Sequence, residues 1–287
     1  MSATLFWPSL QRTSHNRDTV AERIVLVFGL VILALIAVAA LFPQFIAPGD
    51  PLATNSSQVL LAPSLEHPFG TDQSGRDVFD RVIHATGTSI AVGLRAVGIA
   101  FVVGALLGTA AGVAPHWLDQ VISRAIEAVM AFPEFLIALL VVAIMGKGPT
   151  AVAVGVTISV IPAYVRLARI TARRLKVSGA YEASMLLGTH PQVATVRHVL
   201  PGVGSALLSL AVVGFGSAVV SAAGLSFLGL GVQPPTPEWG LMMSEGKNNL
   251  HNAWWISVCP GIALALTVVA VTMVSRPLQK FLEAGQR

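Results

Sequence analysis

The stretch that decides the architecture is YEASMLLGTHPQVATVRHVLPG, residues 181–202. It separates two apolar runs that are each long enough to cross a bilayer. The chain is therefore expected to leave the membrane at about Arg166 and to return at about Gly204. Connections between spans are ordinarily short, so an excursion of this length predicts a surface that docks a soluble partner. A solvated basic hairpin without a partner is the alternative.

The composition excludes an ordinary soluble protein. Of the 287 residues, 54% are hydrophobic and 11% are charged, whereas an average soluble domain has about 25% charged residues. A bilayer offers no partner for unpaired backbone groups, so apolar runs of about 20 residues are expected to be helices. The sequence thus predicts an all-α polytopic membrane protein with six spans. The runs are residues 24–42, 89–113, 125–145, 150–169, 204–230 and 254–275.

The distribution of basic residues predicts the orientation. Of the 18 Lys and Arg, four fall on one side of the membrane, one (Arg95) lies within a span, and the remaining 13 fall on the side of both termini. The positive-inside rule places both termini and the long loop in the cytoplasm. The four basic residues expected outside are Arg76, Arg81, Lys147 and Lys247.

These expectations divide the chain into segments. Residues 1–23 form a cytoplasmic tail, 24–47 the first transmembrane helix, and 48–86 an external segment. Residues 87–275 form a five-helix core that contains a cytoplasmic loop at 170–203. Residues 276–287 form a second cytoplasmic tail.

The external segment contains HPFGTDQSGRDVFDRVI at 67–83. Asp72 is expected to cap a following helix, on which Val78, Phe79, Val82 and Ile83 would share one face. Two interpretations remain open: an amphipathic connector on the membrane surface, or a lid over a translocation path.

Two spans carry unusual residues. Gly104, Gly108 and Gly112 form a repeated small-xxx-small pattern, which favours close helix packing. Arg95 is expected to snorkel or to pair with a carboxylate.

The third expected span contains Glu127, Pro133 and Glu134. An ionisable group at membrane depth is a candidate for function. The favoured interpretation is nevertheless structural, with Glu127 paired to Arg124 three residues earlier and Pro133 opening the backbone. A proton relay is the alternative.

The segment LSFLGLGVQPPTPEWG, residues 225–240, predicts a proline-stiffened external turn. Trp239, Trp254 and Trp255 are expected in the interfacial aromatic belt.

Several chemistries have no sequence signal. No phosphate-binding Gly-x-x-x-x-Gly-Lys-Ser/Thr loop and no His-Glu-x-x-His motif occurs, so neither nucleotide nor metal binding by this chain is expected. Cys259 is the only cysteine and excludes an intrachain disulfide framework. Gly224-Leu225-Ser226 does not complete a nucleophile elbow, and catalysis by this chain is not expected.

Three motifs in this order resemble one family. They are FGTD at 69–72 with GRDV at 75–78, EA at 182–183 with Gly188 and RHVLP at 197–201, and LSFLGLG at 225–231 with PEWG at 237–240. Together, over about residues 20–265, they resemble the C-type permease subunit of the dipeptide/oligopeptide/nickel ABC importers. Ser184 departs from the second Ala of the loop motif, and residues 272–276 lack the Asn and Gly-Asp usual near the tail.

The resemblance implies a type I importer permease fold in the inner cell membrane. The implied partners are a homologous permease, two ATP-binding subunits that hold ATP and Mg, and an external solute-binding protein. The implied cargo is a di- or oligopeptide, with chelated nickel or a glutathione-like peptide as alternatives. A secondary transporter and an intramembrane hydrolase are the alternatives from other classes, and co-purified ATPases would separate them from an importer.

The resemblance also implies two sets of site residues. Those expected to couple to the ATPase are Tyr181, Glu182, Ala183, Ser184, Leu187, Gly188, His198, Leu200 and Pro201. Those expected at an external gate or in contact with the binding protein are Gly70, Thr71, Asp72, Gly75, Arg76, Asp77, Pro237, Glu238, Trp239 and Gly240.

The residue types suit a docking loop of short helices. Glu182 near a helix start favours the helix dipole, and Gly188 permits a sharp turn. Pro191 can begin the next helix, and Pro201 is expected to break the loop from the fifth span.

Overall fold

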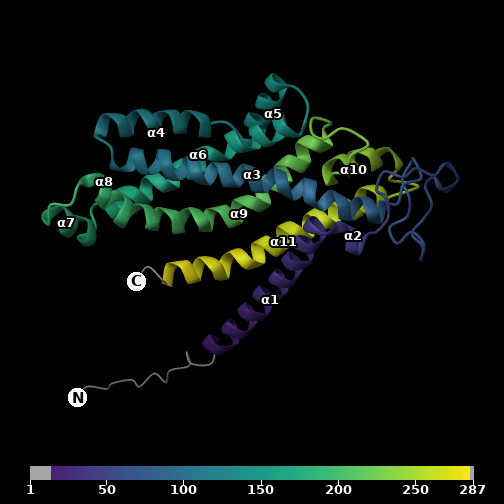
Figure 1. Ribbon diagram of the computed structural model, residues 1–287, viewed down its shortest axis with the longest axis horizontal. Coiled ribbons are helices and arrows are strands. Elements are labelled where there is room, and N and C mark those ends of the chain that lie inside the picture. The colour runs from purple at the N-terminus through teal and green to yellow at the C-terminus, as the bar shows by residue number, and fades with distance from the viewer. Residues whose placement is uncertain (1–13, 285–287) are drawn as a thin grey trace, which may run out of the picture.

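The computed structural model describes residues 14–284, and within them the chain is almost entirely helical. The only β pairing in this range is an isolated bridge between Thr71 and Asp77. The elements are α1 (Ser14–Leu41), α2 (Pro43–Ile46), α3 (Val78–Val113), α4 (His116–Met130), α5 (Glu134–Met145), α6 (Pro149–Lys176), α7 (Gly179–Leu186), α8 (Pro191–Ala194), α9 (Leu200–Phe227), α10 (Trp239–Gly246) and α11 (Trp255–Ala284). Helices α3, α4, α6, α9 and α11 run roughly along one long axis (Figure 1).

Five of the helical segments among the described residues are long and apolar enough to cross a membrane. They are Arg23–Leu41, Val78–Val113, Pro149–Lys176, Pro191–Phe227 and Trp255–Ser275. The all-α polytopic prediction is confirmed.

The third expected span, residues 125–145, is not one straight helix. It is divided between α4 and α5, whose axes meet at 88°. Pro133 stands at the break, where it has no N–H to donate and disfavours helical backbone at the residue before it. The expected opening of the chain at Pro133 is thus a sharp bend, and only the bent pair can count as a sixth span.

The centre of the bundle is the contact between α3 and α6, and the three glycines of α3 lie in it. A Cβ added at Gly104 would lie 2.5 Å from the Cβ of Tyr164, and one added at Gly112 would lie 2.7 Å from the Cβ of Ala172. No side chain fits at such distances. The prediction of close helix packing by this stripe is confirmed.

The first and last long helices lie beside each other. A Cβ at Gly29 of α1 would lie 2.9 Å from the Cβ of Met273 in α11. Both helices extend into the expected tails, because α1 begins at Ser14 and α11 continues to Ala284. Residues 1–13 and 285–287, the rest of these tails, lie outside the described residues.

The bundle has two contrasting ends (Figure 1). At the α7 end, the short helices α7 and α8 project past the ends of α3 and α6. At the α10 end, α10 packs on α9 and α11 beside the start of α3.

Candidate functional site

A buried ion network organises the α10 end. The Asp72 carboxylate accepts a hydrogen bond from Nε of Arg76 at 2.7 Å and lies 3.6 Å from Nε of Arg81. Nη2 of Arg81 also donates to Glu245 of α10 at 3.2 Å. Asp72, Arg76 and Arg81 are each at most 5% exposed. Charges this deeply buried are tolerated because each has an opposite partner.

Arg81 connects several segments that are far apart in the sequence, which no sequence motif indicated. Nη1 donates to the carbonyl oxygens of Pro51 and Pro235, each at 3.2 Å. One side chain therefore joins the external segment, α3, the proline-rich turn and α10.

The helix that follows the external motif is capped by Asp77 and not by Asp72. Oδ1 of Asp77 accepts from the backbone N–H groups of Phe79 and Asp80 at 2.7 and 3.1 Å, which caps α3. The expected helix cap at Asp72 is wrong, because the carboxylate of Asp72 is held by the two arginines instead. Oδ2 of Asp77 lies 2.7 Å from Nδ1 of His67.

Thr71 and Gly70 lie in a tight loop beneath α11. The Thr71 hydroxyl donates to the carbonyl of Gln58 at 2.5 Å. The backbone carbonyl of Thr71 accepts a hydrogen bond from the indole N–H of Trp255 at 3.0 Å. Gly70 has a φ of +70°, and a Cβ there would lie 2.6 Å from the carbonyl oxygen of Leu61. Glycine is required for both reasons.

Glu238 caps α10 from a buried position. Its carboxylate accepts from the N–H groups of Gly240 and Leu241 at 3.0 and 2.9 Å, and from the hydroxyl of Ser89 at 3.2 Å. Burial raises the pKa of Glu238 above its ordinary value, and the two backbone hydrogen bonds oppose that rise. Burial likewise raises the pKa of Glu245, with Arg81 opposing it.

The tryptophans do not all lie in an exposed belt. Trp239 and Trp255 are 1% and 5% exposed, and the indole N–H of Trp239 donates to the carbonyl of Val82 at 3.1 Å. Of the three tryptophans expected in the belt, only Trp254, at 50%, is substantially exposed. The expectation of an interfacial belt is wrong for the two buried rings.

The residues expected to form an external gate are thus brought together, but all except Asp77 are buried. Gly75, Pro237 and Gly240 complete the buried set. The exposed surface that they support carries Leu52, Val59, Leu61 and Leu65. A lid or a binding-protein contact at this end stays a prediction.

At the α7 end, the predicted helix start, sharp turn and second helix start are confirmed. Glu182 lies in the first turn of α7, Gly188 has a φ of +78°, and Pro191 begins α8. No atom lies within 4 Å of the Cβ position at Gly188, so the backbone angle alone requires glycine there.

The expected break at Pro201 is absent. Pro201 lies in the first turn of α9, where its missing N–H costs little. A π-helical turn, Thr195–Val199, leads into α9 without interruption, and Pro191–Phe227 counts as one long helical segment.

The loop around α7 exposes large apolar side chains. Leu186 and Leu187 are 89% and 86% exposed, and Val193 and Val196 are 54% and 62% exposed. Glu182, Ala183, Gly188 and Pro201 are exposed, Ser184, His198 and Leu200 are half-buried, and Tyr181 is buried.

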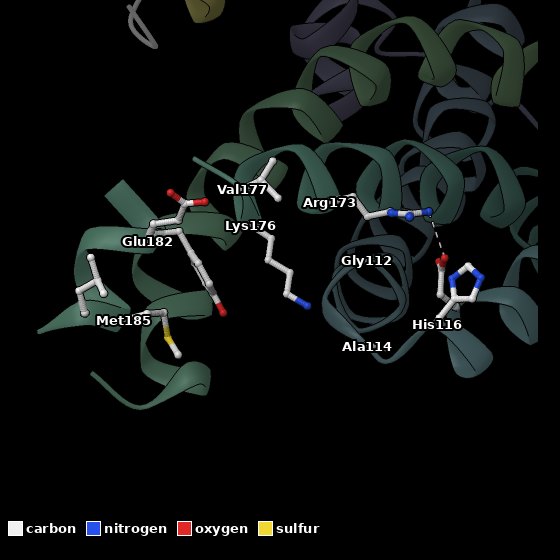
Figure 2. A pocket seen from close by; sticks show the side chains of 11 residues that line it. Gly112, Ala114, His116, Arg173, Lys176, Val177, Glu182 and Met185 are labelled. Carbon is white, nitrogen blue, oxygen red and sulfur yellow. Dashed lines mark hydrogen bonds and ion pairs between the residues drawn. The ribbon is translucent and has the colours of Figure 1, made fainter. Parts of the chain in front are cut away.

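A groove of about 700 Å³ lies beside α7 (Figure 2). Nζ of Lys176 donates to the carbonyl of Val113 at 2.8 Å, which closes the C-terminal end of α3. Tyr181 and Glu182 of the expected coupling set form part of the wall. The full lining is Gly112, Ala114, His116, Asp119, Arg173, Lys176, Val177, Tyr181, Glu182, Met185 and Leu186.

A second ion cluster holds α4 to α6. The Asp119 carboxylate, 4% exposed, accepts hydrogen bonds from both Nε and Nη2 of Arg169 and from Nη1 of Arg173 at 3.1 Å. Figure 2 shows Arg173 reaching across to α4.

Sequence reasoning missed Arg81, Glu245 and Asp119 as site residues. Arg81 and Glu245 are 164 positions apart, and Asp119 and Arg169 are 50 apart. The only available signal was the presence of charged residues beside apolar runs. By contrast, the local pair of Arg124 and Glu127 is confirmed at 3.1 Å.

Comparison with known proteins gives a consistent picture. The family model described as "binding-protein-dependent transport system inner membrane component" matches residues 104–287. The di/tripeptide transport system permease protein DppC of Pseudomonas aeruginosa is 35% identical over 97% of this chain and 90% of its own length.

Two further relatives extend the comparison. The glutathione transport system permease protein GsiD of Pectobacterium atrosepticum is 36% identical over 93% of this chain and 89% of its own. The dipeptide transport system permease protein DppC of Alkalihalophilus pseudofirmus is 34% identical over 90% of this chain and 84% of its own length.

Proposed function

Because this chain belongs to the family of binding-protein-dependent transport system inner membrane components, we propose that it forms, with a homologous permease subunit, the membrane path for peptides brought by an external binding protein. Relatives named as dipeptide, di/tripeptide and glutathione permeases support a peptide cargo. A glutathione-like peptide is the second candidate because GsiD resembles the chain as closely as the DppC proteins do.

The orientation follows from the positive-inside rule. Arg173, Arg174 and Lys176 lie in the last turn of α6, so the α7 end faces the cytoplasm and the α10 end faces outward. Both termini are then cytoplasmic.

The observation that carries the coupling proposal is the exposure of Leu186 and Leu187. These leucines lie on the projection beyond the long helices, between the two candidate spans Pro149–Lys176 and Pro191–Phe227. Exposed apolar side chains of this kind indicate a protein contact. The α7–α8 projection therefore docks an ATPase subunit, and the groove beside it accommodates part of that contact.

The chain itself is a non-catalytic subunit. Two ATPase subunits hold ATP and Mg, and their closure moves the α7 ends of the two permeases together. At the outer end, the buried network of Asp72, Arg76 and Arg81 shapes the surface that meets the binding protein or gates the path. Replacing Asp72 or Arg76 by Ala should then depress uptake while the ATPases remain bound.

Docking is tested with Leu187→Asp in the assembled transporter, with Leu61→Asp at the opposite end as the matched control. Leu187→Asp should lose the co-purifying ATPases and peptide uptake, because a buried unpaired charge is costly. Leu61→Asp should keep the ATPases. Retention of the ATPases and of uptake in Leu187→Asp would refute the docking site.

Orientation is tested separately with single cysteines at Ser57 and at Ala180, both exposed, in a Cys259→Ser background. A membrane-impermeant thiol reagent added outside should label position 57 and not position 180. Labelling of both from the same side would overturn the orientation.

A further inference from the structure

A second hollow, of about 370 Å³, lies between α4 and α6. Helix α4 exposes most of its residues and packs mainly on α6, so the hollow opens along the side of the bundle. None of the motif residues contributes to it. Its lining is Ser123, Ile126, Glu127, Met130, Ala131, Arg166, Arg169 and Ile170.

The charge of this hollow is positive. Arg166 is exposed, and no carboxylate whose side chain the structure describes lies within ion-pair distance of it. Arg169 uses Nε and Nη2 on Asp119, which leaves its remaining N–H groups available. Glu127 is already paired with Arg124.

The surroundings do not neutralise that charge. Four arginines lie in or beside the hollow, at positions 124, 166, 169 and 173, and among the described side chains their ion-pair partners are the two carboxylates of Asp119 and Glu127. The excess favours an anionic occupant. A guanidinium binds phosphate well because its N–H groups match the spacing of the oxygens.

The same hollow has an apolar margin. Met130 and Ile170 are 41% and 52% exposed, and Ile126 lies beside them in the lining. Arg166 precedes Lys176, the end of α6, by ten residues, or about 15 Å of helix. The segment is expected to leave the bilayer at about Arg166 itself, so this arginine lies near the level of the lipid headgroups.

We propose that this hollow binds an anionic phospholipid, with the phosphate on Arg166 and Arg169 and the acyl chains along Ile126 and Met130. A basic pocket between transmembrane helices near the cytoplasmic side suits such a headgroup. The bound lipid contacts both α4 and α6 where the hollow opens. Its negative charge offsets the excess positive charge of the arginines. Only the assignment to the inner leaflet rests on the proposed orientation.

The test uses the assembled transporter and native mass spectrometry after exchange into mixtures of phosphatidylglycerol and phosphatidylcholine. Wild type should retain phosphatidylglycerol preferentially. Arg166→Gln should lower that retention about five- to tenfold, as expected for the loss of one basic contact. Arg174→Gln is the matched control, because it removes an equal charge from the same helix outside the hollow, and it should retain the lipid.

Each alternative occupant gives a distinct result that overturns the proposal. Equal losses in Arg166→Gln and Arg174→Gln mean attraction to surface charge only. Displacement of the lipid by inorganic phosphate means a free anion site, and displacement by a dipeptide means that the hollow belongs to the cargo path. Equal retention of both lipids in wild type also overturns it, and this last measurement requires no variant to fold.

Discussion

The two ends of the molecule use their motif residues in opposite ways. At the α10 end, polar and charged side chains such as Asp72 and Glu238 are buried and paired. At the α7 end, apolar side chains such as Leu186 and Leu187 are exposed. A buried paired charge maintains the structure of its own chain, whereas the exposed leucines are the residues for which we propose a contact with the ATPase. Under that proposal, similar glycine- and proline-rich motifs mark a scaffold at one end and a contact surface at the other.

The largest effect should come from Arg81→Met at the α10 end. Removing the guanidinium leaves buried Asp72 and half-buried Glu245 to share Arg76, so one negative charge is uncompensated, which costs about 3–5 kcal/mol. Thermal unfolding of the purified chain in detergent should show a much lower midpoint. Lys247→Met, an exposed cation at the same end, should leave the midpoint nearly unchanged. A wild-type midpoint for Arg81→Met would show that the buried network is not a scaffold.

A smaller effect, seen in association rather than in stability, should come from Leu186→Ala combined with Leu187→Ala. Loss of both buried contacts should weaken ATPase binding by about 3 kcal/mol, or roughly a hundredfold. The unfolding free energy should change by no more than about 0.5 kcal/mol, as for other surface sites.

The matched control for this pair is Leu61→Ala combined with Leu65→Ala at the α10 end. Titration of each purified permease variant with ATPase subunits measures the difference. Weaker ATPase binding by the control pair, with normal binding by the α7-end pair, would reverse the comparison.

Gly188→Ala should have a still smaller effect. A non-glycine residue in left-handed backbone costs about 1–2 kcal/mol, and no neighbouring atom adds a clash. We expect a partial loss of uptake per ATP hydrolysed. Gly179→Ala, at a position with ordinary φ and no neighbour within 4 Å, should couple normally. Equal coupling in both variants would mean that the turn tolerates other angles.

The smallest effect concerns pH at the α10 end. Burial raises the pKa of Glu245 in the folded chain, so the folded state binds this proton more tightly than the unfolded state. The resulting stability is full below the unfolded pKa and is lost as pH rises through the folded pKa. The unfolding midpoint of wild type should therefore fall as pH rises from about 4.5, and Glu245→Gln should show a shallower slope. Identical slopes would exclude Glu245 as a contributor.

Sequence predicted those features that depend on neighbours along the chain. The turn at Gly188, the start of α8 at Pro191 and the pair of Arg124 and Glu127 each depend on residues at most four positions apart. Backbone angles and helix-surface pairs are set locally, so their signals are present in the sequence.

Features decided by packing were not predictable in this way. Asp72 and Asp77 are both suitable helix caps, and the choice depends on Arg81, which is brought to Asp72 by contacts with Pro235 and Glu245. Trp239 was expected at an interface, but it is buried because α10 folds against the start of α3. The bend at Pro133 likewise places α5 against α6, a segment that comes later in the chain.

Helix α3 is long and uninterrupted, so it connects the two ends of the molecule as one rigid element. This helix has 36 residues and no proline, so it extends about 54 Å. Arg81 anchors one end in the buried ion network, and the Val113 carbonyl receives Lys176 at the other. The three glycines hold α3 in close contact with α6. If ATPase closure moves the α7 end of α6, as proposed above, α3 should move with it as a single rigid helix, and the ion network should restrict the movement of its far end.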